Sequence, residues 1–294
     1  MFYTLGELAE LGADVRLGVI GNPIAHSKSP QMQQAALNDA GQPYRYVRLL
    51  ADTAEGGFEA MLAALAARGF LGVNVTVPFK KKAFAAAVQA DALSTLCGAA
   101  NTLMRKEDGW HCHNTDGPGF ERAIQELSGR PLADMRVVLL GACGGAGSAL
   151  AAQCALSHCR ALTLVNRPRP ELEQMAATLA PHYGAPIPYC HFGTTELRTA
   201  VAQADLIINA TSLGLKEGDT LPLPAEWLNP GQIVYDIVTH HTPLQQAAAE
   251  RGCMAADGLG MLLWQGAIAF EHWFGQLPSV ESMRTALIGA ESSR

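Results

Sequence analysis

The segment RVVLLGACGGAGS, residues 136–148, decides the fold class of the second half of the chain. It opens with a continuous apolar run, which is typical of a strand buried on both faces of a parallel sheet. A turn of glycines and alanines follows, and a helix is expected from about Ser148. Glycines in such a turn let the backbone approach a pyrophosphate, whose charge the helix N-terminus stabilises. The segment therefore predicts a dinucleotide site, the alternative being a tight strand-to-helix turn without a ligand.

Strand-like and helix-like stretches alternate on both sides of this segment, which indicates an α/β fold with parallel sheets and right-handed crossovers. A turn-rich stretch near residues 116–119 separates two such series and is the expected domain junction. The uncharged residues 137–159 are interpreted as a buried strand, turn and helix rather than a membrane span. Predicted strands cover residues 17–21, 44–50, 72–77, 136–141, 161–166, 205–210 and 232–238, and predicted helices cover 29–40, 58–68 and 259–274.

Composition excludes several classes of function. The chain has 294 residues, a net charge of −6 and no basic stretch denser than Lys80–Lys82, so a nucleic-acid surface is not expected. Seven cysteines without a C-x-x-C pair favour reduced thiols in a cytoplasmic protein, and the acidic start of the chain is unlike a signal peptide. The run His111–His113 lacks further spaced ligands, so no metal site is predicted.

The end of the strand at residues 161–166 bears on the choice of cofactor. An acidic residue at this place holds the ribose 2′-hydroxyl of NAD in many dinucleotide folds. Here the chain reads Asn166-Arg167-Pro168-Arg169 instead. Two guanidinium groups suit a 2′-phosphate, which favours NADP, although NAD stays possible and the arginines can also be read as a solvated loop.

The segment GNPIAHSKSP, residues 21–30, places hydroxyl groups at the start of a predicted helix. Ser29 suits the N-cap position and Pro30 the first helical position. The partly positive helix N-terminus favours a substrate carboxylate, and capping by Ser29 alone is the alternative.

Several motifs together carry a resemblance to a known family. The chain resembles the shikimate/quinate dehydrogenase family from about Leu17 to Pro278, with the motifs in the family's order. The matching segments are GNPIAHSKSP (21–30), NVTVPFK (74–80), GAANTL (98–103), NTDG (114–117), NATSLG (209–214) and ADGLGMLLWQGAIAF (256–270).

This resemblance implies a two-domain α/β fold and a role for each matched position. Residues 1–115 and 258–294 would form the substrate-binding and catalytic domain, and residues 116–257 the Rossmann-like NAD(P)-binding domain. Lys80 and Asp116 would be the catalytic pair, with the proton taken by Lys80, or by Asp116 while Lys80 polarises the hydroxyl. The substrate would be bound by Ser27 and Ser29 at its carboxylate and by Thr76, Asn101, Thr115 and Gln265. The cofactor would be bound by Gly141, Ala142, Gly144, Gly145, Ala146, Asn166, Arg167, Arg169, Thr211 and Gly258.

The resemblance also implies the reaction: reversible, NADP-dependent oxidation of shikimate to 3-dehydroshikimate, a step of aromatic amino acid biosynthesis in the chorismate pathway. The alternatives are a quinate or aminoshikimate dehydrogenase that uses NAD, and a non-catalytic ligand-sensing homologue. The expected partner is a small hydroxy acid, with no nucleic acid and no membrane, and the protein would be a monomer or a homodimer.

Four positions depart from the family pattern. Thr239 stands where a tyrosine is frequent, Cys143 lengthens the glycine turn by one residue, and Cys112 replaces a glycine. Arg169 lies closer to Arg167 than is usual for the second basic residue of an NADP loop. These departures point to a divergent branch, and they affect the choice of substrate more than the reaction class.

Overall fold

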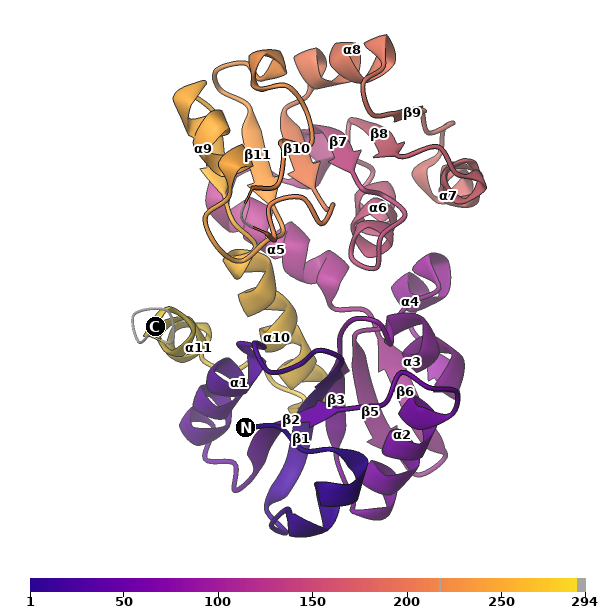
Figure 1. The fold of residues 1–294 in the computed structure, drawn as a ribbon, viewed down its shortest axis with the longest axis vertical. Coiled ribbons are helices and arrows are strands. Elements are labelled where there is room, and N and C mark those ends of the chain that lie inside the picture. The colour runs from indigo at the N-terminus through magenta and orange to yellow at the C-terminus, as the bar shows by residue number, and fades with distance from the viewer. Residues whose placement is uncertain (217, 290–294) are drawn as a thin grey trace. The chain divides into compact units, whose positions relative to one another are not determined.

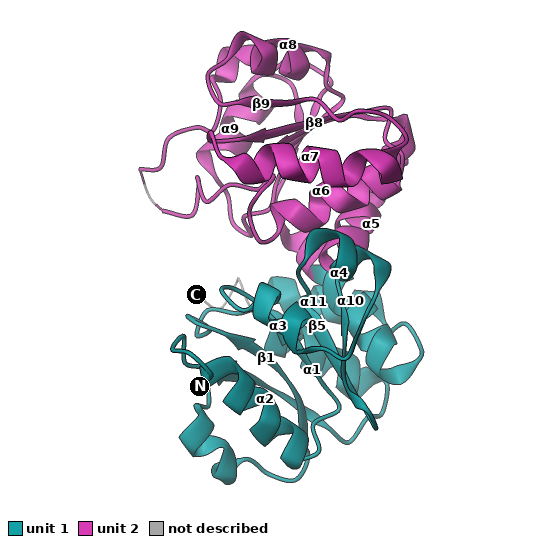
Figure 2. Cartoon of the chain, turned by 90° about the vertical axis from the view of Figure 1, so that its right-hand side faces the viewer, with its two compact units in different colours: residues 1–115, 263–294 teal, residues 116–262 magenta. Residues whose placement is uncertain are grey.

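The computed structural model describes residues 1–216 and 218–289, and these divide into two compact units. Unit 1 comprises Met1–Thr115 and the chain from Leu263 onward, and unit 2 comprises Asp116–Leu262 (Figure 2). The last segment of the chain therefore returns to unit 1. The second junction lies at Leu262/Leu263, a little later than the position 257/258 expected from the sequence.

Unit 2 contains a sheet in which every described strand pairing is parallel. Its strands follow the order β12-β11-β10-β7-β8-β9. Counted from β7, this is the order 3-2-1-4-5-6 of the doubly wound dinucleotide-binding fold. The elements are α5 (Asp116–Ser128), β7 (Arg136–Leu140), α6 (Gly147–Leu156), β8 (Ala161–Asn166), α7 (Pro170–Tyr183), β9 (Tyr189–His191), α8 (Thr195–Gln203), β10 (Leu206–Asn209), β11 (Ile233–Asp236), α9 (Pro243–Glu250) and β12 (Met254–Ala256), with short 3-10 turns at Leu132–Asp134 and Ala225–Trp227.

The central strand β7 is buried along almost its whole length because helices cover both faces of the sheet. Val138 and Leu140 belong to a cluster with Leu197 of α8 and Leu244 of α9. On the other side, α6 contacts β7 and packs against α5 and α7. The predicted strand, turn and helix of residues 137–159 are thus confirmed, and in the described part of the chain no helix is long and apolar enough to span a membrane.

Unit 1 contains a mixed sheet with the strand order β2-β1-β3-β5-β6-β4. Strands β1, β2 and β3 are parallel, as predicted, and lie side by side in Figure 1. The elements are a 3-10 helix (Leu5–Glu10), β1 (Val15–Gly21), α1 (Ser29–Asp39), β2 (Arg45–Leu50), α2 (Gly57–Ala67), β3 (Gly72–Val75), α3 (Lys80–Ala86), β4 (Gln89–Ala90), α4 (Ala92–Cys97), β5 (Thr102–Lys106), β6 (Gly109–His113), α10 (Leu259–Phe274), which begins in unit 2, and α11 (Val280–Gly289).

The hairpin of β5 and β6 corrects the expectation of purely parallel sheets. β5 pairs antiparallel with β3 and with β6. A two-residue connection, Glu107-Asp108, joins the strands, and Gly109 follows it with a φ of 150°. Such a short connection forces an antiparallel pairing, because a parallel one needs a crossover of a dozen residues or more.

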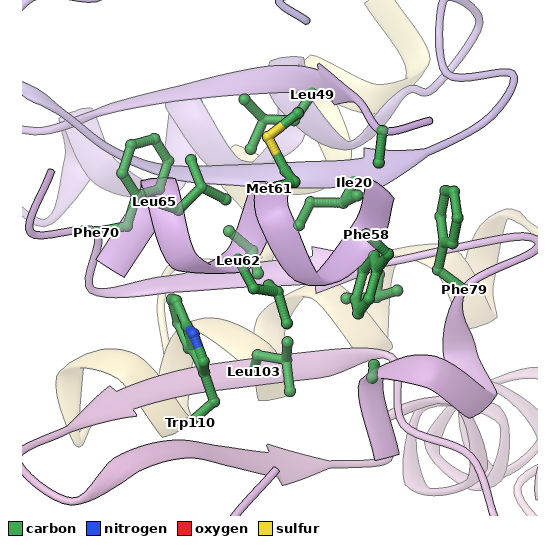
Figure 3. Packing of buried hydrophobic residues seen from close by; sticks show 14 of the residues in the cluster. Ile20, Leu49, Phe58, Met61, Leu62, Leu65, Phe70, Phe79, Leu103 and Trp110 are labelled. Atoms are coloured by element: carbon green, nitrogen blue, oxygen red, sulfur yellow. The ribbon is translucent and has the colours of Figure 1, made fainter. Parts of the chain in front are cut away.

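The core of unit 1 forms where α2 lies on the sheet. Phe58, Met61, Leu62 and Leu65 recur at helical spacing and point from α2 toward the strands (Figure 3). They pack with Ile20, Leu49, Leu103 and Trp110, which come from β1, β2, β5 and β6. This layer fixes the strands whose carboxyl ends carry the predicted substrate-binding segments.

Two local expectations were wrong in detail. Ser29 is the first residue of α1 rather than its N-cap, and Lys28 takes the cap position. β3 ends at Val75 instead of Val77, because the chain turns there: the amide of Phe79 donates to the carbonyl of Thr76.

Candidate active site

The segment before α1 presents Ser27 and Ser29 together. The hydroxyl of Ser27 accepts a hydrogen bond from the amide of Ser29 at 3.3 Å. Arg48 of β2 donates to the carbonyl of Ser27 through Nε at 3.0 Å and Nη2 at 2.5 Å. The turn is therefore fixed from the neighbouring strand, with its two hydroxyl groups at the start of a helix, where an anion is favoured.

Thr76 and Lys80 follow β3. A Cβ atom on Gly21 would lie 2.5 Å from Cγ2 of Thr76, so a glycine is needed where the ends of β1 and β3 meet. Lys80 is the first residue of α3, and its carbonyl accepts from the amide of Ala100 at 2.9 Å. This bond places the lysine backbone beside the residue that precedes Asn101.

A buried cluster joins three predicted substrate residues of unit 1: Asn101, Thr115 and Gln265. The Oδ1 atom of Asn101 accepts from the amide of Thr115 at 2.8 Å. Its Nδ2 atom donates to the Thr115 hydroxyl at 3.0 Å and to Oε1 of Gln265 at 3.3 Å. All three side chains are buried. The structure thus brings together residues that lie up to 164 positions apart in the sequence.

Asp116 follows Thr115 directly and is the first residue of α5 in unit 2. Its side chain is 5% exposed. The predicted catalytic residues Lys80 and Asp116 thus belong to different units, and each begins a helix.

The predicted cofactor residues of unit 2 follow the carboxyl ends of its parallel strands. Gly141 follows β7 with a φ of 85°, and a Cβ there would lie 2.9 Å from the amide nitrogen of Thr211, which follows β10. Gly258 follows β12, and a Cβ there would lie 2.1 Å from the carbonyl oxygen of Ile237. Ligands of open α/β sheets bind at this edge, where the strand order reverses.

Buried polar groups hold the loop that carries Thr211. Oδ1 of Asn209 accepts from the Thr211 amide at 3.1 Å and from its hydroxyl at 2.7 Å. Nδ2 of Asn209 donates to Asp236 at 3.1 Å, and Thr242 donates to the same carboxylate at 2.8 Å. Burial raises the pKa of Asp236 above its ordinary value, although these hydrogen bonds lower it.

The glycine turn has a closed side and an open side. A Cβ on Gly147 would lie 2.2 Å from the carbonyl oxygen of Gly141, so Gly147 is fixed by packing of the turn on itself. A Cβ on Gly145 would meet nothing within 4 Å, and one on Gly144 would meet only carbonyl oxygens, at 3.3 and 3.6 Å. Ala142 is buried and Ala146 caps α6. The open side at Gly144 and Gly145 fits a phosphate group at the N-terminus of α6.

Beyond β8, the two arginines of the predicted NADP loop differ. Arg169 forms a paired contact with Glu171, with Nε–Oε2 at 3.2 Å and Nη2–Oε1 at 3.4 Å. Arg167 is exposed and has no ion-pair partner among the described residues. Asn166 is buried, and its carbonyl lies 3.1 Å from Nδ1 of His191. Arg167 is therefore the better candidate to hold an added phosphate.

The unusual histidines do not gather around a metal. Along β6 the side chains alternate, so His111 contacts Asp108 at 2.8 Å while Cys112 is buried on the other face. No group of three or more histidine, cysteine or acidic side chains suited to a metal occurs among the residues described. In the loop after β11, His240 and His241 are both exposed, and Nε2 of His240 lies 3.0 Å from the carbonyl of Gly214.

Two histidines of unit 1 stack on each other, a contact that was not predicted from the sequence. The rings of His113 on β6 and His272 on α10 stack with centroids 3.9 Å apart. Nδ1 of His113 lies 3.7 Å from the carboxylate of Asp91, which also accepts from the amide of Asn114 at 3.1 Å. Burial and the neighbouring His113 lower the pKa of His272 to about 4.

Comparison with known proteins places this geometry in a family. Residues 19–103 match the shikimate dehydrogenase substrate binding domain, and residues 258–288 match the shikimate 5′-dehydrogenase C-terminal domain. The chain is 39% identical over 283 residues to the shikimate dehydrogenase (NADP+) of Moorella thermoacetica, which covers 94% of each chain.

Solved structures agree with this match. A crystal structure of shikimate dehydrogenase in complex with NADP+ is similar with a TM-score of 0.85 at 30% identity, covering 95% of this chain and 97% of the other. The quinate dehydrogenase of Corynebacterium glutamicum in complex with NAD gives a TM-score of 0.83 at 27% identity, covering 94% and 99%. With the strand order, the glycine turn and the ordered polar motifs in agreement, the chain belongs to the shikimate dehydrogenase family of NAD(P)-dependent oxidoreductases.

Proposed function

We propose that this protein catalyses the reversible, NADP-dependent oxidation of shikimate to 3-dehydroshikimate. The observation that carries the proposal is the buried cluster of Asn101, Thr115 and Gln265 in unit 1. Neutral amide and hydroxyl groups are suited to bind the hydroxyl groups of a small substrate, because they both donate and accept hydrogen bonds. A molecule that carries several ring hydroxyls and one carboxylate matches this cluster together with the serines before α1.

The polarity of the cluster adds detail to this assignment. The Thr115 amide can only donate, so the Asn101 atom at 2.8 Å is the oxygen and its NH2 group faces Gln265. Gln265 accepts from that group through its oxygen, which directs its own NH2 group elsewhere. The Gln265 NH2 group therefore faces away from Asn101.

The cofactor would be held by unit 2. Gly144, Gly145 and the N-terminus of α6 would hold the pyrophosphate, and Arg167 would pair with the 2′-phosphate. When bound, NADP+ would supply a hydride acceptor. The remaining chemistry, which is binding, orientation and proton movement, belongs to the side chains of this protein.

Lys80 and Asp116 would act on the hydroxyl group that is oxidised. Loss of hydride from a carbinol requires loss of the hydroxyl proton, so a group that can take the proton belongs within hydrogen-bond reach. Either Lys80 takes it, or Lys80 polarises the oxygen while Asp116 takes it. Ser27 and Ser29 would hold the carboxylate and so orient the ring.

We place the reaction in the cytoplasm, where the seven free thiols of the chain would stay reduced.

Quinate is the second candidate substrate, with NAD as its cofactor. Two observations favour keeping it: the similarity to a quinate dehydrogenase with NAD bound, and Thr239, which stands where relatives with a tyrosine would present a phenol. A smaller side chain at this position would leave room for an additional ring substituent.

The deciding experiment is the initial rate of nicotinamide reduction by the purified protein, with shikimate or quinate crossed against NADP+ or NAD+. We expect shikimate with NADP+ to give the highest kcat/KM. A preference for quinate with NAD+ would transfer the assignment to the second candidate. Cofactor binding without turnover in any of the four combinations would support a ligand-sensing homologue instead.

A further inference from the structure

We propose that Tyr46, a residue of β2 that lies outside every family motif, is a positioning residue for the substrate-binding amides and acts through Asn74. The inference rests on the proposed function, because it concerns the same site. It adds a residue that touches neither substrate nor cofactor and that controls how Asn101 is presented.

The contact that carries the inference is buried. The Tyr46 hydroxyl lies 2.8 Å from Oδ1 of Asn74, and both side chains are only 5% exposed. Nδ2 of Asn74 donates to the carbonyl of Asn101 at 3.3 Å and to the hydroxyl of Thr102 at 3.1 Å. That hydroxyl lies 3.2 Å from Oδ1 of Asn101. A continuous chain of hydrogen bonds therefore joins β2 to the substrate cluster.

Elementary hydrogen-bond rules fix the direction of this chain. A backbone carbonyl can only accept, so the Asn74 atom facing Asn101 is the nitrogen, and its oxygen faces Tyr46. Tyr46 must then donate. Burial raises the pKa of Tyr46 well above its ordinary value, so the hydroxyl keeps its proton throughout the working pH range.

The oxygen and the nitrogen of the Asn74 side-chain amide contact different residues. Its NH2 group contacts the carbonyl of Asn101 and the hydroxyl of Thr102, and it can hold both only while its oxygen is turned the opposite way. The phenol stabilises that orientation, because a buried amide oxygen without a donor is costly. Without the phenol, the Asn74 side chain would reorient or shift. The backbone carbonyl of Asn101 would then lose its contact with Asn74, and the Thr102 hydroxyl, which lies against Oδ1 of Asn101, would lose its contact with Asn74 as well.

The test is Tyr46→Phe, which removes one oxygen atom and keeps the ring. Tyr183→Phe is the matched control, because it removes a phenol that donates to a backbone carbonyl at 2.7 Å in unit 2, on α7. For Tyr46→Phe we expect the KM for shikimate to rise about tenfold, which corresponds to about 1.4 kcal/mol of binding free energy. The KM for NADP+ should stay within about twofold of the unaltered protein, since the lost hydrogen bond is local to unit 1.

A second measurement tests the route through Asn74. If Tyr46 acts through that amide, Tyr46→Phe should raise the KM for shikimate no further in an Asn74→Ala background. If the double variant instead raises the KM for shikimate by the product of the two single-variant increases, the route through Asn74 is overturned. An unchanged KM for shikimate in the single variant Tyr46→Phe would overturn the inference by itself. A fall in kcat with both KM values unchanged would mark Tyr46 as merely structural and would also overturn it.

The proposed function can fail separately from this inference. If the unaltered protein neither binds nor oxidises shikimate, the proposed function falls and the role of Tyr46 falls with it. If the unaltered protein is active and Tyr46→Phe behaves like Tyr183→Phe, only the role of Tyr46 is refuted.

Discussion

Replacing Arg167 by alanine should weaken NADP+ far more than NAD+, and more than the same change at Arg169. The two arginines lie two positions apart, yet their surroundings differ. Arg169 donates to the Glu171 carboxylate through Nε at 3.2 Å and through Nη2 at 3.4 Å, so much of the charge of its guanidinium is already neutralised. Arg167 has no ion pair in the part of the chain that the structure describes.

The expected magnitude follows from one charged contact. A hydrogen bond to a charged group contributes about 1.5–3 kcal/mol, and an exposed site takes the lower end, so Arg167→Ala should raise the KM for NADP+ roughly 10- to 30-fold. Arg169→Ala should change it by less than about threefold, as for a surface ion pair. Neither variant should change the KM for NAD+ much, since NAD+ lacks the phosphate.

The assay is the initial rate at saturating shikimate with NADP+ or NAD+ varied. Arg160→Ala is the control, because Arg160 is exposed and precedes β8, whereas Arg167 follows the same strand at its other end. Added salt should reduce the effect of Arg167→Ala, since exposed charges are screened. A larger effect at Arg169, or an equal loss for both cofactors at Arg167, would refute the reasoning.

Three further predictions concern catalysis, the turn and pH. Lys80→Ala or Asp116→Asn should lower kcat by about 10²- to 10⁴-fold, while a fluorescence titration should show that NADPH still binds. Normal turnover in either variant would remove that residue from the mechanism. Gly147→Ala should lower the free energy of unfolding, measured in urea, by about 1–3 kcal/mol, because the added methyl group would overlap a backbone carbonyl. Gly145→Ala should leave the free energy of unfolding unchanged and raise the KM for NADP+. The reverse pattern would contradict the assignment of Gly145 to the open side of the turn. The pKa of His272 is about 4 in the folded chain and 6.5 in the unfolded chain, so the unfolded chain binds the proton first as the pH falls. The free energy of unfolding should therefore decrease between pH 6.5 and pH 4. The decrease should be at most about 2 kcal/mol, because His272 is partly exposed. His272→Phe should flatten that slope in urea titrations, and an unchanged slope would assign the acid sensitivity to other groups.

Much of the fold could be predicted because local patterns and tertiary packing agree. The strand at Ala161–Asn166 and the helix at Leu259–Phe274 occur at the predicted residues. Both are mainly apolar and have clear boundaries, the kind of signal that period and turn residues define well. The alternation of strands and helices predicted the parallel pairing that unit 2 shows, whereas the order of its strands comes from the structure.

The β5–β6 hairpin was missed for a physical reason. Its strands carry residues of both polarity classes, so neither is a continuous apolar run, and the matched motifs at Asn101 and Asn114 lie only at its two ends. The register Thr102 opposite His113 brings those two motifs together, and only the tertiary structure shows it. The stack of His113 on His272 depends on the same register and on α10, which follows much later in the chain.

The candidate site shows the same division between local and non-local information. Motifs identified which residues gather, because a serine before a helix or a glycine after a strand has a local cause. They did not identify which atom of each amide would face the proposed substrate. That is decided by donors and acceptors that cannot change their role, namely the amide of Thr115 and the carbonyl of Asn101. Because these groups belong to the backbone, the fold itself sets the orientation of the Asn101 and Asn74 amides, and in our proposal a residue as remote in sequence as Tyr46 takes part in setting it.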